Sequence, residues 1–237
     1  THTAKRRLVA SYNGDPMQIV VIPHGAVDLG QAAPVERRSG GRPLVLTWGL
    51  IGPGKGIEWA IEAMVGLRDL QPRYLVMGRT HPKVAHRDGE AYRDGLVEQA
   101  RSAGVEGIVE LDDHYLDAVE LAELVQRADV VLLPYDSREQ VSSGVLIEAV
   151  AARRPVVSTA FPHAIELLGD GTGLVVPQRD PVALEAALRR VLSEPDLAAG
   201  MAEHAARKAP ELLWPAVADR YRRIAARVVA AGMAEAS

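Results

Sequence analysis

Short runs of apolar, mostly β-branched residues alternate along this chain with stretches whose apolar residues have helical spacing. A strand that is apolar on both faces must be covered on both faces, and strands that alternate with helices build a parallel sheet. The expected strands are residues 43–49, 73–78, 107–111, 129–135, 155–159 and 173–176. The expected helices are residues 1–14, 56–67, 90–104, 117–128, one beginning near Val145, 180–193, and two or more within 196–231. The sequence therefore predicts an α/β fold with a doubly wound, parallel, Rossmann-like sheet.

Two segments near the start stand outside this alternation. Residues 18–25, QIVVIPHG, form a β-branched run that Pro23 and Gly25 stop, which is typical of a strand. Residues 27–43 are polar and rich in Gly and Pro, so we expect a loop. The first residue is Thr1 rather than Met, and we expect either a processed leader or a fragment of a longer protein.

The composition excludes several classes of function. Hydrophobic residues make up 48% of the 237 residues, which is enough for a buried core. The net charge of −4 argues against binding that depends on neutralising nucleic-acid phosphates. With no cysteine there is no disulfide, thiolate metal site or catalytic thiol. No apolar run approaches the roughly 20 residues that span a bilayer, and no signal peptide is visible, so we expect a cytoplasmic protein.

Four turns follow expected strands, at the edge where doubly wound sheets bind ligands. The first, GLIGPGKG (49–56), nearly matches the phosphate-loop motif, but Gly56 stands where Ser or Thr would hold magnesium. This argues against a nucleoside triphosphatase. The basis for phosphate binding remains, because glycines let the backbone approach, a helix N-terminus offers N–H groups and Lys55 adds charge. A plain strand-to-helix turn would give the same pattern.

The second and third turns carry polar side chains that are compatible with a ligand or with solvent. MGRTHP (77–82) places Arg79 and His81 at the ligand edge. LDDHYLD (111–117) contains two aspartates and His114. We expect no metal site there, because adjacent residues point in different directions and no partner ligand has helical or hairpin spacing. No G-x-S-x-G elbow occurs, although a Ser-His-Asp triad stays open.

The fourth turn lies in QVSSGVLIEAVAARRPVVS (140–158). Ser142, Ser143 and Gly144 precede the expected helix, whose N-terminal N–H groups would attract an anion. Glu148 follows about one turn later and would face the same ligand region or the solvent. An ordinary carboxylate that stabilises the helix dipole is the alternative to a ligand-binding role.

Six segments in order resemble the donor-binding half of retaining glycosyltransferases of family 4, which have the GT-B fold. They are VIPHGAVD, GLIGPGKG, MGRTHP, ADVVLLPY, QVSSGVLIEAVAARRPVV and GLVVP, and the resemblance covers about residues 20–195. It implies the C-terminal half of an enzyme that transfers a hexose, with retention, from a UDP- or GDP-sugar to an unknown acceptor (glycan, lipid or small molecule). It also implies no cofactor, no essential metal and no nucleic-acid partner.

The same resemblance implies three parts of the chain. Residues 1–17 would be a remnant of the N-terminal acceptor domain or a linker helix, and residues 18–210 the donor-binding domain. The helices of residues 211–237 would cross back to the missing N-terminal domain. We therefore expect a chain that is incomplete for catalysis, with any peripheral membrane contact made only through the missing domain.

By resemblance, Lys55 would hold the donor diphosphate and Glu148 would accept hydrogen bonds from the ribose hydroxyls. Backbone N–H groups of Val145 and Leu146 would bind phosphate. The full set that the resemblance places at the donor is Gly54, Lys55, Gly78, Arg79, Tyr115, Ser142, Ser143, Gly144, Val145, Leu146 and Glu148. In that set Ser143 and Gly144 would line the sugar, and the turns of Gly78, Arg79 and Tyr115 would frame the base and ribose. The catalytic residues would be Gln140, Glu148 and Lys55.

Three positions depart from the family pattern. Gln140 stands where a first Glu is expected, since Glu139 comes one residue too early, and an amide brings no charge to an oxocarbenium-like transition state. Leu50 replaces an Arg, which leaves Lys55 as the cation of its turn, with Arg79 as a conceivable substitute. Arg153 replaces a Gly, at a cost of roughly 1 kcal/mol if the position is left-handed.

Two other classes of function stay open. One is a non-catalytic module that binds nucleotide sugars and has lost the first Glu. The other is a different enzyme on the same architecture, such as a nucleotide-sugar epimerase or a phosphorylase-like enzyme. The segment from Gln140 to Glu148 disfavours an epimerase, and no lysine signature for pyridoxal phosphate is apparent.

Overall fold

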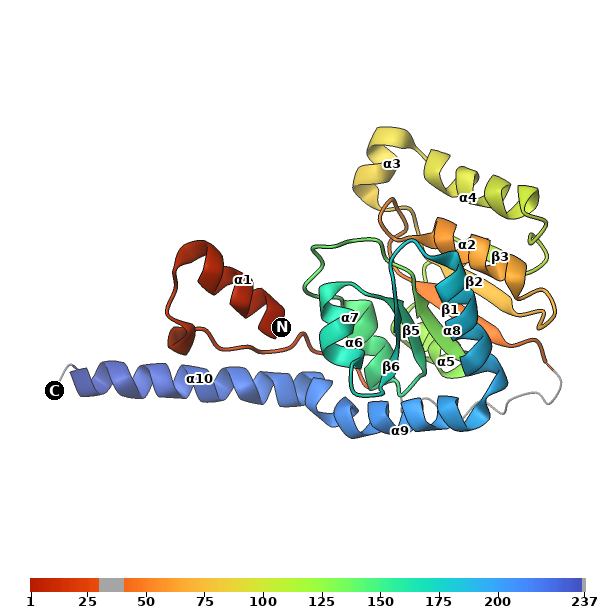
Figure 1. The fold of residues 1–237 in the computed structure, drawn as a ribbon. Helices are drawn as coiled ribbons and strands as arrows, with labels where there is room; N and C mark the ends of the chain where they lie inside the picture. The colour runs from red at the N-terminus through yellow and green to blue at the C-terminus, as the bar shows by residue number, and fades with distance from the viewer. Residues whose placement is uncertain (30–40, 236–237) are drawn as a thin grey trace.

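A six-stranded parallel sheet forms the centre of the molecule. The computed structural model describes residues 1–29 and 41–235 (Figure 1). The strands are β1 (Leu44–Trp48), β2 (Arg73–Met77), β3 (Val109–Asp112), β4 (Val130–Leu133), β5 (Val156–Thr159) and β6 (Gly173–Val176). Their order in the sheet is β3-β2-β1-β4-β5-β6. The chain thus starts in the middle, runs to one edge, returns beside β1 and runs to the other edge, which confirms the doubly wound prediction and places the switch point between β1 and β4.

Helices cover both faces of this sheet. One face packs under α5 (Ala118–Arg127), α6 (Gly144–Ala151), α7 (Pro162–Leu168) and α9 (Pro195–Leu212). The other face packs under α2 (Ile57–Gly66), α4 (Ala91–Ser102) and α8 (Pro181–Ser193). All five residues of β1 are buried, with Leu46 facing the first layer and Val45 the second. Two-sided burial explains why the strands read as continuous apolar runs.

Two short helices were missed by the sequence prediction. They are α3 (Pro82–Asp88) and α7 (Pro162–Leu168), and each has seven residues with a proline in its first turn. Seven residues are too few for a clear apolar period. Pro82 and Pro162 were the available signal, because proline fits the start of a helix, where its missing N–H costs nothing.

The strand prediction for residues 18–25 was wrong. The first of these residues, Gln18, ends the short 3₁₀ helix η1 (Pro16–Gln18), Ile19 is extended, and the residues up to Gly25 pair with no strand of the sheet. The next segment meets the junction of α9 and α10 instead: the Ala26 N–H donates to the Leu212 carbonyl at 2.8 Å, and the Trp214 N–H donates to the Ala26 carbonyl at 3.1 Å. A β-branched run alone therefore does not make a strand, because no neighbouring strand pairs with it. Of the loop predicted for residues 27–43, residues 30–40 lie outside the described residues.

The first and last helices lie beside the sheet domain (Figure 1). Helix α1 (His2–Tyr12) is held by Glu166 of α7, which accepts hydrogen bonds from the His2 and Thr3 N–H groups at 2.8 and 3.0 Å. Helix α10 (Trp214–Glu235) continues from α9 and projects away from the sheet, with Tyr221 and Val228 exposed. Within the described residues, none of the helices has the length and apolarity needed to cross a membrane.

Candidate functional site

The four predicted turns meet at one edge of the sheet, beyond the carboxyl ends of the strands. The turn after β1 bonds to the turn after β2, since the Gly49 N–H donates to the Met77 carbonyl at 3.0 Å and the Ile51 N–H to the Arg79 carbonyl at 2.9 Å. Gly78 has φ +136°, and a Cβ there would lie 2.1 Å from the Gly49 carbonyl oxygen. Only glycine fits that position, so the two backbones can approach this closely.

The turn after β1 also packs against the turn after β4, across the switch point. The Asp136 N–H donates to the Gly54 carbonyl at 3.1 Å. Gly56, at the start of α2, has φ +64°, and a Cβ on it would lie 1.8 Å from the Pro134 carbonyl oxygen. Glycine at position 56 is thus required by this contact, although a phosphate loop that holds magnesium would have Ser or Thr there.

Lys55 lies at this switch point. Its Nζ is 4.2 Å from the centre of the Tyr135 ring, over the ring face. Burial lowers the pKa of Lys55. The structure describes no carboxylate paired with this ammonium within residues 1–29 and 41–235. A cation without a bonded anion is well suited to receive an anionic ligand.

Glu148 faces the site rather than the solvent. The Trp48 indole N–H, at the end of β1, donates to Glu148 Oε2 at 3.2 Å. Helix α6 has no acidic residue in its first turn, and its cap is Ser143, whose Oγ accepts from the Leu146 N–H at 3.2 Å. The helix-dipole explanation of Glu148 therefore loses its basis, because the macrodipole acts on the first turn.

The Ser143 cap changes the expected role of Leu146. Its N–H was expected at phosphate, but here it already donates to Ser143 Oγ, so a phosphate would share or displace that bond. Gly144 approaches the His24 ring, since a Cβ built on it would lie 3.6 Å from that ring. His24 therefore joins the site from the segment before the sheet. Ser142, in contrast, is exposed.

His163 was missed by sequence reasoning, and it supports the loop before α6. Its Nδ1 accepts a hydrogen bond from the Ser143 N–H at 2.9 Å, and only 4% of the residue is exposed. Burial lowers the pKa of His163 to about 4, so the ring is neutral at pH 7, which the accepting Nδ1 requires. No spacing pattern could have found this contact, because it depends on the unpredicted helix α7.

The side chains of Gln140 and Glu139 lie in different surroundings. The Glu139 side chain is 82% exposed and pairs with Arg7 of α1, with 2.6 Å between Nη1 and Oε2. Gln140 is half-buried, and its carbonyl accepts from the His163 N–H at 3.4 Å. Glu139 therefore points to α1 and does not replace the carboxylate that is absent at position 140.

Arg79 and Tyr115 lie together at the outer end of the site. The Arg79 guanidinium is 5.9 Å from the centre of the Tyr115 ring, and both side chains are exposed. A largely buried side chain that sequence reasoning missed, that of Arg93 of α4, donates a hydrogen bond to the Gly78 carbonyl and so braces the turn after β2. Within the described part of the chain, Arg79 is linked to the Lys55 turn through its backbone carbonyl, which accepts from the Ile51 N–H, and not through its side chain.

The argument that Asp112, Asp113 and His114 point in different directions was wrong. One ligand atom from each lies within 4.8 Å of the others. The cause is a local turn, in which the His114 N–H donates to Asp112 Oδ1 at 2.9 Å and folds the side chains together. Hydrogen bonding between Asp112 and His114 raises the pKa of the imidazole and contributes to lowering that of the carboxyl. These groups satisfy each other, so the cluster gives no reason to assign a metal.

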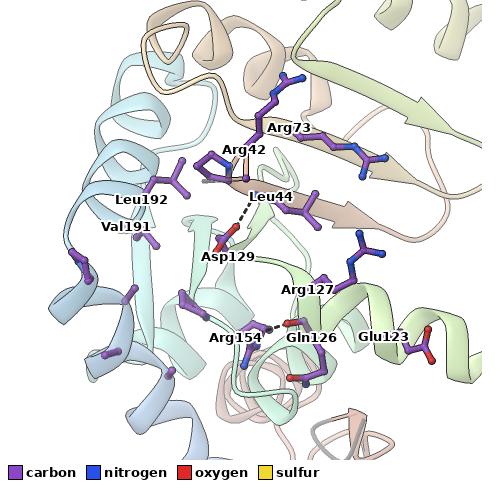
Figure 2. A pocket seen from close by; sticks show the side chains of 17 residues that line it. Arg42, Leu44, Arg73, Glu123, Gln126, Arg127, Asp129, Arg154, Val191 and Leu192 are labelled. Atoms are coloured by element: carbon purple, nitrogen blue, oxygen red, sulfur yellow. Dashed lines mark hydrogen bonds between the residues drawn. The ribbon is translucent and has the colours of Figure 1, made fainter. Parts of the chain in front are cut away.

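A cavity of about 940 Å³ lies at the opposite edge, at the amino ends of the strands (Figure 2). Three of its four arginines bond other groups of the protein. Arg42 donates to the carbonyls of Gln71, Pro72 and Gly107, Arg154 donates to the carbonyl of Gln126, and Arg73 pairs with the Glu110 carboxylate. The cavity is separate from the four turns.

Comparisons with known proteins agree with this arrangement. A family model described as glycosyl transferases group 1 matches residues 42–194. The D-inositol 3-phosphate glycosyltransferase of Kineococcus radiotolerans is 31% identical over 253 residues, which cover 97% of this chain and 56% of that protein. A glycosyltransferase from Rickettsia africae has a TM-score of 0.84 at 17% identity, and Anabaena HepE in complex with UDP has 0.81 at 17% identity. Each of these structures covers 97% of this chain, and this chain covers 62% of each.

The fold is that of the C-terminal, Rossmann-like half of a GT-B glycosyltransferase, as the six segments predicted. The chain belongs to the glycosyl transferases group 1 family. It spans about half the length of the curated relatives that it matches. Membership of family 4 in particular stays a prediction, as do the cytoplasmic location and the roles of the individual site residues.

Arg153 stands where the family pattern has a Gly, and its backbone is left-handed, with φ 60°. We predict that Arg153→Gly raises the free energy of unfolding by about 1 kcal/mol, because glycine relieves the Cβ strain. Urea denaturation measures the change. Arg153→Ala is the matched control, since it removes the same side chain but keeps Cβ. Equal gains from both variants would show that strain at Cβ is not the cause.

The buried His163 predicts a loss of stability in acid. Its pKa is lowered to about 4 in the folded chain and lies near 6.5 when unfolded. The unfolded state therefore binds the extra proton as the pH falls through this window. Unfolding free energy should drop by roughly 1–2 kcal/mol from this group between pH 7 and pH 5. In His163→Asn, which keeps an acceptor for Ser143, that part of the drop should vanish in urea titrations. An unchanged drop would contradict the assignment.

Proposed function

We propose that this chain is the donor-binding domain of a retaining glycosyltransferase. The enzyme would transfer a sugar, a hexose by resemblance, from a nucleotide-diphosphate sugar to an acceptor. The observation that carries the proposal is that Lys55, the start of α6 and Glu148 converge at the switch point between β1 and β4. Ligands of doubly wound sheets bind at such a point.

The site offers separate groups for the parts of a nucleotide-diphosphate sugar. The Lys55 ammonium and the amino ends of α2 and α6 suit the two phosphates, since helix N-termini and a cation both favour negative charge. Glu148 is held through Oε2 by the Trp48 indole, which leaves Oε1 for hydroxyl groups of a ribose. Two structures of Anabaena HepE are complexes with UDP, and this chain has the fold of HepE.

The chemistry that these residues could perform is stabilisation of the departing diphosphate. Bond breaking at the sugar carbon leaves negative charge on the phosphate oxygens, and the Lys55 ammonium and the α6 N–H groups would meet it without a metal ion. Gln140 would donate or accept a hydrogen bond at a sugar hydroxyl. As an amide it adds no charge to the oxocarbenium-like centre, in contrast to the Glu of the family pattern.

The ends of the chain would face an acceptor-binding domain. We propose that residues 1–17 and 211–237 belong to the connection with that domain, while residues 18–210 bind the donor. Exposed apolar side chains on both helices support this: Leu8, Tyr12, Tyr221, Val228, Val229 and Met233. The acceptor would be a glycan, a lipid or a small molecule, and any membrane contact would be made through that other domain.

Nucleotide binding tests the proposal on this chain. We expect at least one of a UDP-sugar and GDP-sugar panel to raise the melting temperature, because a ligand of the native state stabilises it. Glu148→Gln keeps the acceptor for Trp48 and removes the charge, and it should weaken binding about tenfold. Glu123→Gln, at the cavity of the opposite edge, is the matched carboxylate control and should bind as wild type does. Failure of every nucleotide to stabilise the wild type would refute the proposal.

A non-catalytic module that binds nucleotide sugars is the second candidate, and Gln140 is the observation that favours it. Gln140→Glu in a protein that includes the acceptor domain separates the two. A large gain in sugar transfer would indicate a degenerate site, and a loss would show that the amide serves the reaction.

A further inference from the structure

The partner of the Lys55 ammonium is an aromatic ring and not a carboxylate. Nζ lies 4.2 Å from the ring centre of Tyr135, which is within the range of a cation–π contact. Tyr135 stands two residues beyond β4, directly across the switch point from the Lys55 turn.

The Tyr135 ring is fixed from several sides. Only 1% of the residue is exposed, and the Phe161 ring stacks on it with 5.3 Å between centres and 26° between planes. Its backbone carbonyl accepts hydrogen bonds from Thr159 Oγ1 and from Gln178 Nε2. A ring that is packed and anchored in this way can set the position of the flexible lysine side chain above it.

An aromatic face holds a cation without using its hydrogen-bond donors. A carboxylate beside Lys55 would neutralise the ammonium and compete with a phosphate for the same N–H groups. The π face carries no formal charge, so the ammonium keeps its charge and the N–H donors that point away from the ring stay available. This matters in a turn where Leu50 replaces the second cation of the family pattern, so that Lys55 is the sole charged side chain of residues 49–56.

The hydroxyl of Tyr135 does not account for the contact. It is buried, and the polar side chain that acts on it is that of Ser143, not Lys55. The feature that touches Lys55 is the ring. Phenylalanine would preserve the ring, and leucine would replace it with a smaller apolar side chain.

We propose that Tyr135 is a positioning residue, whose ring holds the Lys55 ammonium in place for the diphosphate of the nucleotide donor. The inference rests on the proposed function, and it goes further by naming how the site compensates for its missing second cation. Tyr135 acts through Lys55 and touches no ligand atom in this account.

A double-mutant cycle on the 237-residue chain tests the coupling, with UDP as probe and GDP and ADP in parallel. Calorimetry would compare wild type, Tyr135→Leu, Lys55→Met and the double variant. Tyr135→Leu should weaken UDP binding about five- to thirtyfold, the range of a partly buried cation–π contact. In the Lys55→Met background the same change should have almost no further effect. Equal losses in both backgrounds would overturn the proposal.

The conservative variant separates the ring from the hydroxyl. Tyr135→Phe should restore the affinity that Tyr135→Leu loses, and a loss as large as that of leucine would show that the hydroxyl, not the ring, is needed. Uridine, which lacks phosphates, should bind all four proteins of the cycle alike. A wild type that binds none of the three diphosphates would refute the proposed function itself, whereas binding with additive losses would refute this inference alone.

A spectroscopic readout covers the case in which Tyr135→Leu does not fold. The chain has four lysines, so the ε-methylene signals of ¹³C-labelled lysine are few enough to assign. Ring current should move the Lys55 signal upfield of the other three, both in wild type and in Tyr135→Phe. A Lys55 signal at the ordinary position in wild type would show that the ring does not hold the ammonium.

Discussion

The site depends on two close backbone contacts, each made at a glycine where a Cβ atom would not fit. The carbonyl of Gly49 meets Gly78, and the carbonyl of Pro134 meets Gly56, so the turns after β1, β2 and β4 can approach this closely only because glycine has no Cβ. The two ligand-binding side chains proposed for the site depend on this approach. Lys55 reaches the Tyr135 ring because its turn is pressed against the turn after β4, and Glu148 reaches the Trp48 indole because α6 starts beside the same turn.

The supports of the site come from elements that lie beyond the four turns. His163 on α7 bonds the Ser143 N–H, and Arg93 on α4 bonds the Gly78 carbonyl. Arg7 of α1 pairs with Glu139, next to Gln140, and so connects the first helix to the loop before α6. If residues 1–17 belong to an acceptor domain, this ion pair is a direct physical link between that domain and the loop that would contact the donor sugar.

Sequence patterns predicted the sheet and the edge of the site because both depend on local periodicity. Each expected strand of the sheet and each long helix has its counterpart, and the glycine-rich turns lie where parallel strands end. The pattern failed where a long-range partner decides the outcome. Residues 18–25 form no strand, and the residue after them, Ala26, bonds to the junction of α9 and α10. The Leu146 N–H is a local exception, because the side chain of its own helix cap, Ser143, takes it. The contacts of His163 and Arg93 have no spacing signature at all, since they join distant segments. Arg153 is the opposite case, because the Gly of the family pattern was enough to suggest a left-handed φ at this position.

The most direct test of the account is the indole signal of Trp48. The chain has three tryptophans, so a ¹H–¹⁵N spectrum resolves three indole N–H signals. Since the Trp48 indole bonds Glu148, a nucleotide whose ribose reaches that carboxylate must change its signal. Titration with UDP or GDP is predicted to move the Trp48 signal in step with binding. Saturable binding that leaves Trp48 unmoved and shifts backbone signals around Arg127 and Arg154 instead would contradict the account and place the ligand in the cavity at the amino edge.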